Sequence, residues 1–461
     1  MNHETTLVAQ CLFWIFLVGT VVLPVRWSVI AYLLLVQFDL SGIGNYSIGS
    51  LGFENAIKVV VVPTLLLIRV RPIESLAPRF KRLSYLWLLL SAYAAVAIAW
   101  SPYRLSAIKM LGYFYAYSAL FVVFVAAWRR QWFRATSVAF VIWLSLIIAS
   151  IQTYILGNEY GNPEFGSRFT TFVSAQSFAA FLLSLLVLLL FSEEWGPLVL
   201  ITTLGGSIGL VLTGSRSIFL GFIWIVLVGG IVLTAGSGRK LNYRLIAKKC
   251  ALSVAGILCV GALVVNFLPE NRLNEMIAAA VSPNVALEDV GTFGWRFALY
   301  QKTVDELANR KLLMLLTGSG TSSGANVILE NGIFKEDIVD PNRSLHDEFL
   351  RSIYEWGLFG LLFFVLFLTE LINVGVRMAT QKRSREAWAF LAICVPLLLS
   401  LTVENVLADS ASPGGIGYSL VLTSMVAAGC VRVEKKRGRG FNTNSEITFH
   451  PGSSAVGISG S

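Results

Sequence analysis

The chain has 461 residues, of which 56% are hydrophobic and only 14% are charged. A water-soluble domain of this length would not stay dispersed with so little charge, so the composition excludes a soluble globular protein. Runs of about 18 or more apolar residues recur along the chain, and each is long enough to cross about 30 Å of hydrocarbon as a helix. The sequence therefore predicts an all-α polytopic membrane protein.

The apolar runs predict 12 or 13 transmembrane helices, because the second run is too short to settle whether it crosses fully. The first run leads into further spans without a cleavage site, so we expect an anchor rather than a removed signal peptide. No internal repeat is found among the runs. The predicted spans are residues 7–23, 27–38, 55–70, 84–100, 106–128, 133–156, 172–191, 195–213, 217–235, 249–268, 349–376, 386–407 and 414–431.

Clusters of basic residues orient the predicted bundle. Alternating spans place all of them on one side, which the positive-inside rule makes cytoplasmic. The net charge of +9 is therefore mainly a topology signal, and it also attracts anionic lipid head groups. No basic folded domain exists to bind nucleic acid. The clusters are Arg69, Arg71, Arg79, Lys81 and Arg82; Arg129, Arg130 and Arg134; Arg239, Lys240, Arg244, Lys248 and Lys249; Arg377, Lys382, Arg383 and Arg385; and Arg432, Lys435, Lys436, Arg437 and Arg439.

On the opposite, non-cytoplasmic side, the longest non-membrane segment connects two groups of spans. Long loops in compact proteins are usually functional or disordered, and the helical pattern and aromatic residues of this one favour a function. The predicted organisation is N-terminal spans (1–268), a large loop on this side (269–348), C-terminal spans (349–431) and a tail that is basic and then disordered (432–461).

The stretch VLTGSRSIFLGF places Arg216 in a turn between two predicted spans on that side. Gly214 can end the preceding helix in the left-handed conformation, and Ser215 is a good N-cap for the next helix. Arg216 and Ser217 then fall in the first helical turn, where free backbone N–H groups and the helix dipole attract anions. A cation suits this position where a negative ligand binds, although an arginine that reaches lipid phosphates would also fit.

The stretch NRSLHDEFLRSIYEWGLFG has the same construction. Ser344 and Asp347 resemble a capping box, which puts His346 in the first turn, where the dipole helps to keep the imidazole neutral and able to accept a proton. Asp347, Arg351 and Glu355 would then form an acid–base–acid row on one helix face. His346 is the one histidine outside the terminal tails; a partly exposed histidine at the membrane interface is the alternative.

Further candidates lie on the same side. Arg296, in GTFGWRFALYQ, falls in a short predicted helix, and Arg168, in GSRFTTF, opens a span; each would also suit interfacial anchoring. The run TGSGTSSG, 317–324, has backbone N–H groups that could cradle an oxyanion, but it lacks the Lys-Ser/Thr ending of a phosphate-binding P-loop, which favours a flexible turn. Glu370 and Glu404 lie in or near spans, which indicates either a function or a hydrogen-bonded packing role. No HExxH, paired-cysteine or Asp-x-Asp pattern occurs, so we expect neither a metal nor a cofactor.

Three of these stretches together resemble the O-antigen ligase and polymerase family of bacterial membrane glycosyltransferases. They are TGSRS, GWRFALY and LHDEFLRSIYEWGLFGLLFF, in the family's order and spacing over residues 165–375. The resemblance implies a helical bundle of the membrane glycosyltransferase C type, a glycan donor on undecaprenyl diphosphate, and a metal-independent transfer with inversion. The chain departs from the family where Asp347 replaces the usual asparagine and where RFTTFVSAQ replaces a Gly-Phe and Pro-Asn pattern.

By this resemblance, Arg216 and Arg296 would stabilise the departing diphosphate, and His346 would take the proton of the acceptor hydroxyl. The acceptor would be a growing glycan for a polymerase or a lipid A-core sugar for a ligase, and the departure at RFTTFVSAQ favours the polymerase. A polysaccharide chain-length regulator and membrane lipids are further expected partners. The enzyme would lie in the bacterial inner membrane with a periplasmic active face. The other expected substrate contacts are Arg168, Ser215, Ser217, Asp347 and Arg351.

Two other functions remain open. A protein O-oligosaccharyltransferase would share the architecture. A polysaccharide or lipid transporter (a flippase) belongs to another class, in which internal repeats and broken helices commonly place ionisable groups near the bilayer midplane. Here the candidate residues gather at one face beside a large loop and no repeat occurs, which favours the transferase.

Overall fold

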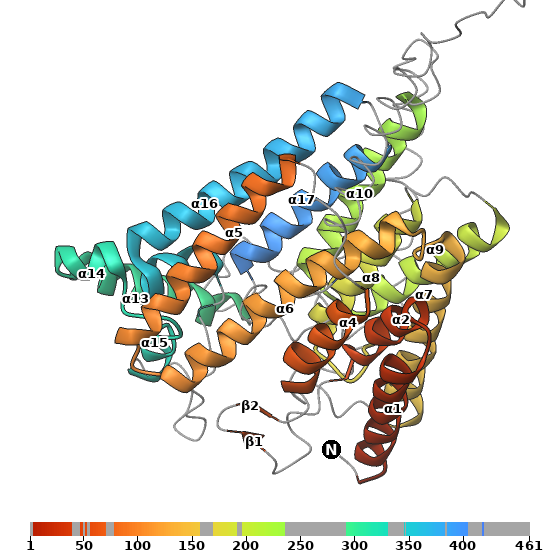
Figure 1. Cartoon of the computed structure of the whole chain (residues 1–461), viewed down its shortest axis with the longest axis horizontal. Coiled ribbons are helices and arrows are strands. Elements are labelled where there is room, and N and C mark those ends of the chain that lie inside the picture. The colour runs from red at the N-terminus through yellow and green to blue at the C-terminus, as the bar shows by residue number, and fades with distance from the viewer. Residues whose placement is uncertain are drawn as a thin grey trace, which may run out of the picture.

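The computed structural model of the chain is a bundle of helices with three further helices at one side (Figure 1). Within the described residues, the strands are a two-residue antiparallel pair, and helices make up almost everything else, which confirms the predicted all-α membrane fold. The described residues are 3–38, 47–48, 51–52, 56–70, 78–156, 169–190, 196–235, 292–330, 345, 347–382, 385–403 and 417–418.

Every span predicted within the described residues is helical. The predicted spans 249–268 and 414–431 lie outside the described residues, except for residues 417–418, as does the tail 432–461. The first elements are α1 (His3–Val22), α2 (Val25–Leu35), β1 (Ser47–Ile48), β2 (Leu51–Gly52), η1 (Ile57–Val61), α4 (Val62–Val70), α5 (Pro78–Val96), η2 (Ala97–Trp100), α6 (Arg104–Arg129), α7 (Ala135–Ser150) and η3 (Ile151–Ile155). The later elements are α8 (Ala175–Leu190), α9 (Pro197–Leu212), α10 (Arg216–Ala235), α13 (Thr292–Ala308), α14 (Leu312–Thr317), α15 (Ala325–Glu330), α16 (Glu348–Lys382) and α17 (Arg385–Val403).

Four of the described helical segments are long and apolar enough to cross a membrane, judged by length and composition. Several shorter apolar helices accompany them, among them α8 and α9. The predicted total of 12 or 13 spans therefore stays a prediction. The four segments are Arg82–Trp100, Arg104–Arg129, Ala135–Ile155 and Glu348–Arg377.

The centre of the bundle is α8, a run of leucine, alanine and phenylalanine that is buried along almost its whole length. Helices that are apolar on all sides are expected in the interior of a large bundle, because no face of them needs to meet a polar phase. Helices α7, α9, α10 and α17 all contact α8 and surround it. One continuous apolar core follows from this packing.

Close contacts at two glycines fix the directions of the last helices. A Cβ on Gly221, early in α10, would approach Pro396 in the later part of α17 to 2.8 Å, so these two helices pack closely and antiparallel. Gly375, late in α16, similarly lies against Phe390, early in α17. The beginnings of α10 and α16 and the end of α17 therefore lie at the same end of the bundle, which we call the site end.

Helix α5 also ends at the site end. Arg82, near its beginning, forms an ion pair with Glu370 in the later part of α16 at 3.6 Å. Tyr93, near its end, packs edge-on against Phe363, with ring centroids 5.5 Å apart. These contacts make α5 antiparallel to α16, so the segment that follows α5 reaches the beginning of α16. The ion pair indicates a packing role for Glu370, while Glu404 lies outside the described residues.

Candidate active site

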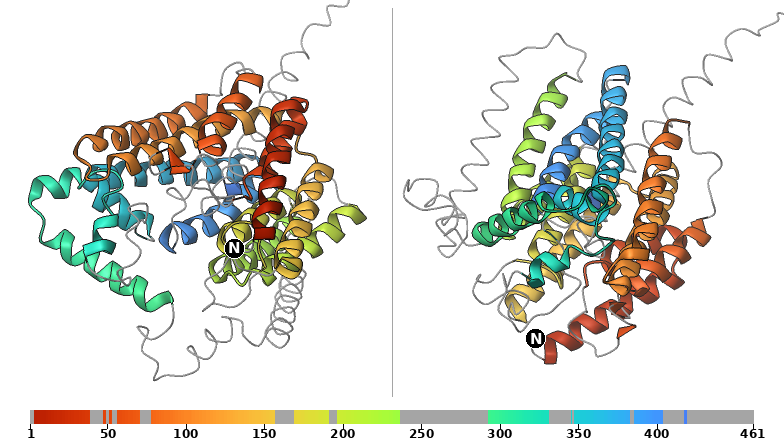
Figure 2. Two further views of the ribbon diagram at one scale, coloured as in Figure 1. Left: turned by 90° about the horizontal axis from the view of Figure 1, so that it is seen from below. Right: turned by 90° about the vertical axis from the view of Figure 1, so that its left-hand side faces the viewer.

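The described part of the large loop forms the three helices α13, α14 and α15. They lie beside the bundle, near the last residues of α5 and the first residues of α16 (Figure 2, left). A small apolar cluster, separate from the main core, joins α13 and α15 to the beginning of α16. The Tyr300 hydroxyl of α13 also donates a hydrogen bond to the Thr402 carbonyl at the end of α17, at 3.3 Å. The site end is therefore where the loop helices attach. The cluster consists of Leu299, Val327, Ile328, Leu345 and Tyr354.

The turn before α10 has the predicted backbone. Gly214 has a φ of 65°, a left-handed conformation that glycine adopts without steric cost. The Ser215 carbonyl accepts a hydrogen bond from the Phe219 N–H at 3.0 Å, so α10 begins at Arg216 with Ser215 as its N-cap residue. Ser217 is partly buried in the first turn. The side chain of Arg216 lies outside what the structure describes.

The prediction that the Ser215 hydroxyl caps α10 is wrong. This hydroxyl is buried, with the residue only 5% exposed, and its oxygen makes no hydrogen bond within the described structure. A buried hydroxyl without a partner costs free energy, which a ligand oxygen at this helix N-terminus would recover. The turn thus presents a polar side chain together with the free N–H groups of the first helical turn.

Arg296 lies on the inward face of α13. It is partly buried, and it shares this face with Leu299 and Thr303, both of which are fully buried, because spacings of three and four residues bring side chains to one side of a helix. Leu299 packs in the same cluster as Leu345, the residue before His346 in the chain. The structure therefore brings the face that carries Arg296 towards the segment that carries His346. Arg168 and His346 themselves lie outside the described residues.

Helix α16 begins at Glu348, and Asp347 is its N-cap. One Asp347 carboxylate oxygen, Oδ1, accepts hydrogen bonds from the N–H groups of Phe349 at 2.8 Å and Leu350 at 2.9 Å. The predicted capping box, which started the helix at Ser344, is therefore wrong; Ser344 lies outside the described residues. An aspartate is as good an N-cap as a serine, and here the cap is the candidate closer in sequence to the apolar run.

Burial raises the pKa of Asp347, while its two backbone hydrogen bonds lower it by less. A raised pKa means that ionisation is less favourable in the folded protein than in the unfolded chain. The stability that Asp347 contributes is therefore fully present below its unfolded pKa and is lost as the pH rises through the folded pKa.

Asp347→Asn and Asp347→Ala should separate the cap from the charge. Asparagine keeps an oxygen for the two N–H groups and has no charge to bury, so we expect a protein at least as stable as the wild type at pH 8, with the difference shrinking towards pH 4. Alanine loses the cap and should cost about 1 kcal/mol. Thermal unfolding in detergent across this pH range is the measurement. Equal losses for both variants would contradict the capping role.

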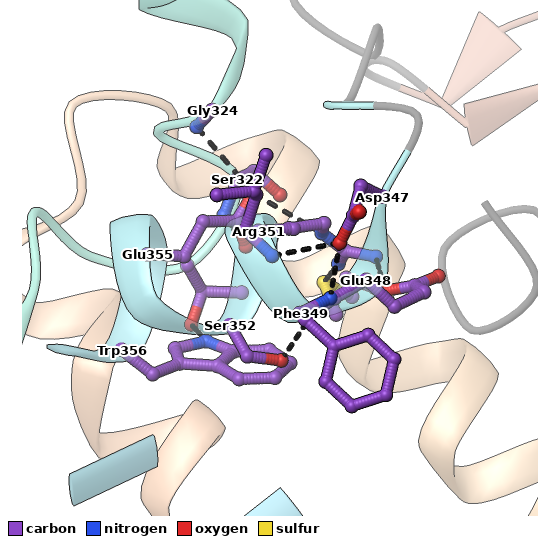
Figure 3. Close-up of polar contacts among 12 residues, drawn as sticks. Ser322, Gly324, Asp347, Glu348, Phe349, Arg351, Ser352, Glu355 and Trp356 are labelled. Carbon is purple, nitrogen blue, oxygen red and sulfur yellow. Dashed lines mark hydrogen bonds and ion pairs between the residues drawn. The ribbon is translucent and has the colours of Figure 1, made fainter. Parts of the chain in front are cut away.

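Arg351 lies in a buried ion cluster in the first turns of α16 (Figure 3). Arg351 is only 1% exposed, and its guanidinium forms ion pairs with the carboxylates of Glu348 at 2.9 Å and Glu355 at 3.2 Å. It also contacts the sulfur of Met110 on α6. The sequence predicted an Asp347–Arg351–Glu355 row on this helix face. The pair of Arg351 with Glu355 is confirmed, but the second partner of Arg351 is Glu348, because the Asp347 carboxylate caps the helix.

The Gly-rich run 317–324 does cradle an oxyanion, and that oxyanion belongs to the protein. The N–H groups of Ser322 and Gly324 donate to the two carboxylate oxygens of Glu355, at 2.8 and 3.4 Å (Figure 3). With Arg351 on its other side, the Glu355 carboxylate has charged and neutral partners that compensate for its burial. The run is therefore an anchored part of the site rather than a flexible turn.

Two glycines with left-handed backbones let this run approach α16. Gly357 interrupts the helical geometry of α16 with a φ of 66°, and Gly318 faces it with a φ of 76°. At this interruption, the carbonyls of Tyr354 and Glu355 accept hydrogen bonds from the N–H groups of Ser319 at 3.0 Å and Gly320 at 2.9 Å. A Cβ on either of the two facing glycines would collide with the backbone of the other segment.

The run also contacts the end of α5 through Thr321. The Thr321 hydroxyl donates to the Ala94 carbonyl at 2.6 Å and accepts from the Trp356 indole at 3.0 Å. The Ser101 hydroxyl in turn donates to the Thr321 carbonyl at 2.6 Å. The loop, α5 and α16 are therefore joined by buried hydrogen bonds next to the candidate residues. Sequence reasoning found the run but not these partners.

Residues 198–365 match a family model described as O-antigen ligase. The chain carries an O-antigen ligase domain. The match begins in α9 and ends within α16, so it contains the turn of Arg216, the loop helices and the beginning of α16. A glycosyltransferase activity of the O-antigen ligase and polymerase type, acting in a membrane, follows from this domain. No curated protein matches the chain. Within its described residues, no group of His, Cys, Asp and Glu side chains is placed to bind a metal ion.

Proposed function

We propose that this O-antigen ligase domain transfers a glycan from undecaprenyl diphosphate to an acceptor sugar at the periplasmic face of the bacterial inner membrane. The observation that carries the proposal is that the beginnings of α10 and α16 lie at the same end of the bundle, the site end, where α13 also attaches. Of the residues in the predicted basic clusters, Arg82, Arg129 and Arg377 lie towards the other ends of their helices. By the positive-inside rule, this arrangement supports a periplasmic site end.

The proposed reaction is one displacement at the anomeric carbon of the donor. An acceptor hydroxyl oxygen forms the new glycosidic bond, the bond from that carbon to the diphosphate oxygen breaks, and the hydroxyl proton passes to His346. Arg216 and Arg296 stabilise the charge that develops on the departing undecaprenyl diphosphate, without a metal ion. The unpartnered Ser215 hydroxyl and the N–H groups at the beginning of α10 add neutral donors to the same oxygens.

The remaining candidate residues divide into two groups. Arg168 and Ser217 stay proposed substrate contacts. Asp347 and Arg351 are better supported as positioning residues, because their charged groups bind the backbone and carboxylates around the beginning of α16. Both hold in place the segment that leads directly from His346.

The choice between polymerase and ligase is testable by a glycan gel of a deletion strain complemented with wild type or His346→Ala. We propose the polymerase, because the segment RFTTFVSAQ departs from the ligase-like pattern. The expected result is loss of long chains, with single repeats still attached to their acceptor, in the deletion strain and with His346→Ala, since a general base contributes roughly 10²–10⁴-fold.

Long chains that stay on undecaprenyl diphosphate, beside a bare acceptor, would identify a ligase instead. An unchanged profile of every surface glycan would contradict glycan transfer as a whole. Immunoblots of the membrane fraction control for insertion of the His346→Ala protein.

A further inference from the structure

A cavity of about 500 Å³ lies along the later part of α13, beyond Arg296 in the chain, and we call it the α13 cavity. Its walls come from the later part of α13, from α14, from the run 317–324, from α15 and from α16. Nothing in the proposed reaction uses it. The side chains that matter for its chemistry are Lys302, Asp305, Asn309, Arg310, Asn326 and Tyr354.

The cavity lies further along α13 than the reaction site. Lys302, Asp305 and Asn309 follow one another at spacings of three and four residues and share a face that is turned away from Arg296, whereas Glu306 and Arg310 line the cavity from the side of α13 that carries Leu299. At 1.5 Å per residue, Asp305 and Asn309 lie about 14–20 Å along the helix axis from Arg296. A group bound in the cavity would therefore not reach the bond that is formed, but a chain of linked groups would.

The chemistry of the walls selects against apolar and anionic ligands. Two cations, two carboxylates and two amides line the cavity, and apolar contributions come from Met314 and Tyr354. A lipid tail would leave these polar groups desolvated without partners, and a diphosphate would meet the carboxylates of Asp305 and Glu306. Sugar hydroxyls both donate and accept hydrogen bonds, so a hydroxyl-rich ligand can satisfy carboxylates, amides and cations together.

Part of the wall is already fixed in position. The Arg310 guanidinium donates to the Tyr354 carbonyl at 2.9 Å and stacks over the Tyr354 ring, 3.7 Å from its centroid. The Tyr354 hydroxyl donates to Glu306 at 2.8 Å. Among the described residues, the side chains of Asp305 and Asn326 make no hydrogen bond of their own. The part of the wall made by Glu306, Tyr354 and Arg310 is therefore preorganised, and Asp305 and Asn326 beside it can hydrogen-bond a ligand.

We propose that the α13 cavity is a subsite for the sugar chain of the substrate, several sugar units away from the reacting bond. The proposal rests on the proposed function, because a glycan-transferring enzyme handles such a chain. Both helices that carry site residues extend from the site end to the cavity: α13 from Arg296 to Asn309, and α16 from its N-cap Asp347 to Tyr354. For a polymerase, a grip on the distant part of the chain would determine how long the product grows.

The test uses the full-length protein in detergent with, as probes, soluble fragments of one, two and four repeat units cut from the host's own surface glycan. We expect the longer fragments to bind, measured by saturation-transfer NMR and calorimetry. Asp305→Ala combined with Asn326→Ala should weaken this binding about tenfold or more, since each removes a hydrogen-bonding group. Val304→Ala, an exposed position on the same helix away from the cavity, is the matched control and should bind as the wild type does.

Binding should also persist in Arg216→Ala and His346→Ala, which separates this proposal from the proposed reaction. In cells, the cavity variant should shorten the glycan chains, whereas the reaction-site variants should remove them. Wild-type affinity in the Asp305→Ala and Asn326→Ala protein, or failure of every fragment to bind the wild type, would overturn the subsite. A surface glycan unchanged by deletion of the gene, with fragment binding intact, would overturn the proposed function alone.

Discussion

Arg216→Ala is expected to abolish glycan transfer while the protein still inserts and accumulates. Arg216 opens α10 next to a buried hydroxyl that has no partner in the described structure, so a negative ligand is the group that both would bind. Removing one preorganised donor to a developing oxyanion costs about 10²–10³ in rate. Arg216→Lys should retain part of the activity, because an ammonium supplies the charge without the two-pronged geometry of a guanidinium.

The measurement is transfer from a purified lipid diphosphate donor, alongside the glycan gel of the complemented deletion strain. Arg104→Ala is a matched control: Arg104 also opens a helix, α6, in the segment just after the end of α5, and its side chain reaches the Ala99 carbonyl at 3.4 Å in an exposed position. This variant should keep near-normal transfer. Near-normal transfer by Arg216→Ala would instead return Arg216 to the role of an interfacial anchor.

Features that depend on neighbouring residues were predictable from the sequence. Hydrophobic runs predicted the bundle helices within the described residues, but not the loop helices α14 and α15. The predicted left-handed backbone at Gly214 is confirmed, because only a few adjacent residues determine such a turn. The beginning of α16 was harder. Ser344 and Asp347 are both good N-caps, and nothing within this short stretch says which of them the buried apolar face selects.

Contacts between distant segments were not predictable. The sequence of the Gly-rich run 317–324 favours a flexible turn over an oxyanion cradle, because its partner, Glu355, is 31 residues from Gly324 and belongs to another element. The spacing of Arg351 and Glu355 predicted their pairing, because residues four apart on a helix are neighbours. That the pair would be buried beneath a loop depended on Gly318 and Gly357 approaching each other, a contact that one sequence alone does not reveal.

Glu355→Ala is expected to destabilise the protein strongly, by about 3–5 kcal/mol, because it removes one partner from a buried ion cluster. Arg351 would keep only Glu348, and the N–H groups of Ser322 and Gly324 would lose their shared acceptor (Figure 3). Glu355→Gln keeps one acceptor oxygen but turns an amide N–H₂ towards a donor, so an intermediate loss is expected. Thermal unfolding in detergent and protease cleavage within 317–324 are the measurements.

A double-mutant cycle identifies the cause. Arg351→Ala alone leaves two carboxylates buried without their cation, so the Arg351→Ala/Glu355→Ala protein should lose less stability than the sum of the two single variants. Glu370→Gln is the matched control on the same helix. The side chain of its partner Arg82 is 71% exposed, and the Arg82 Nε atom lies 3.6 Å from the Glu370 carboxylate. Solvent therefore screens this pair, and the loss of stability should stay below about 1 kcal/mol. Additive losses in the cycle would mean that the two residues act independently, which would contradict the ion pair as the cause of the loss.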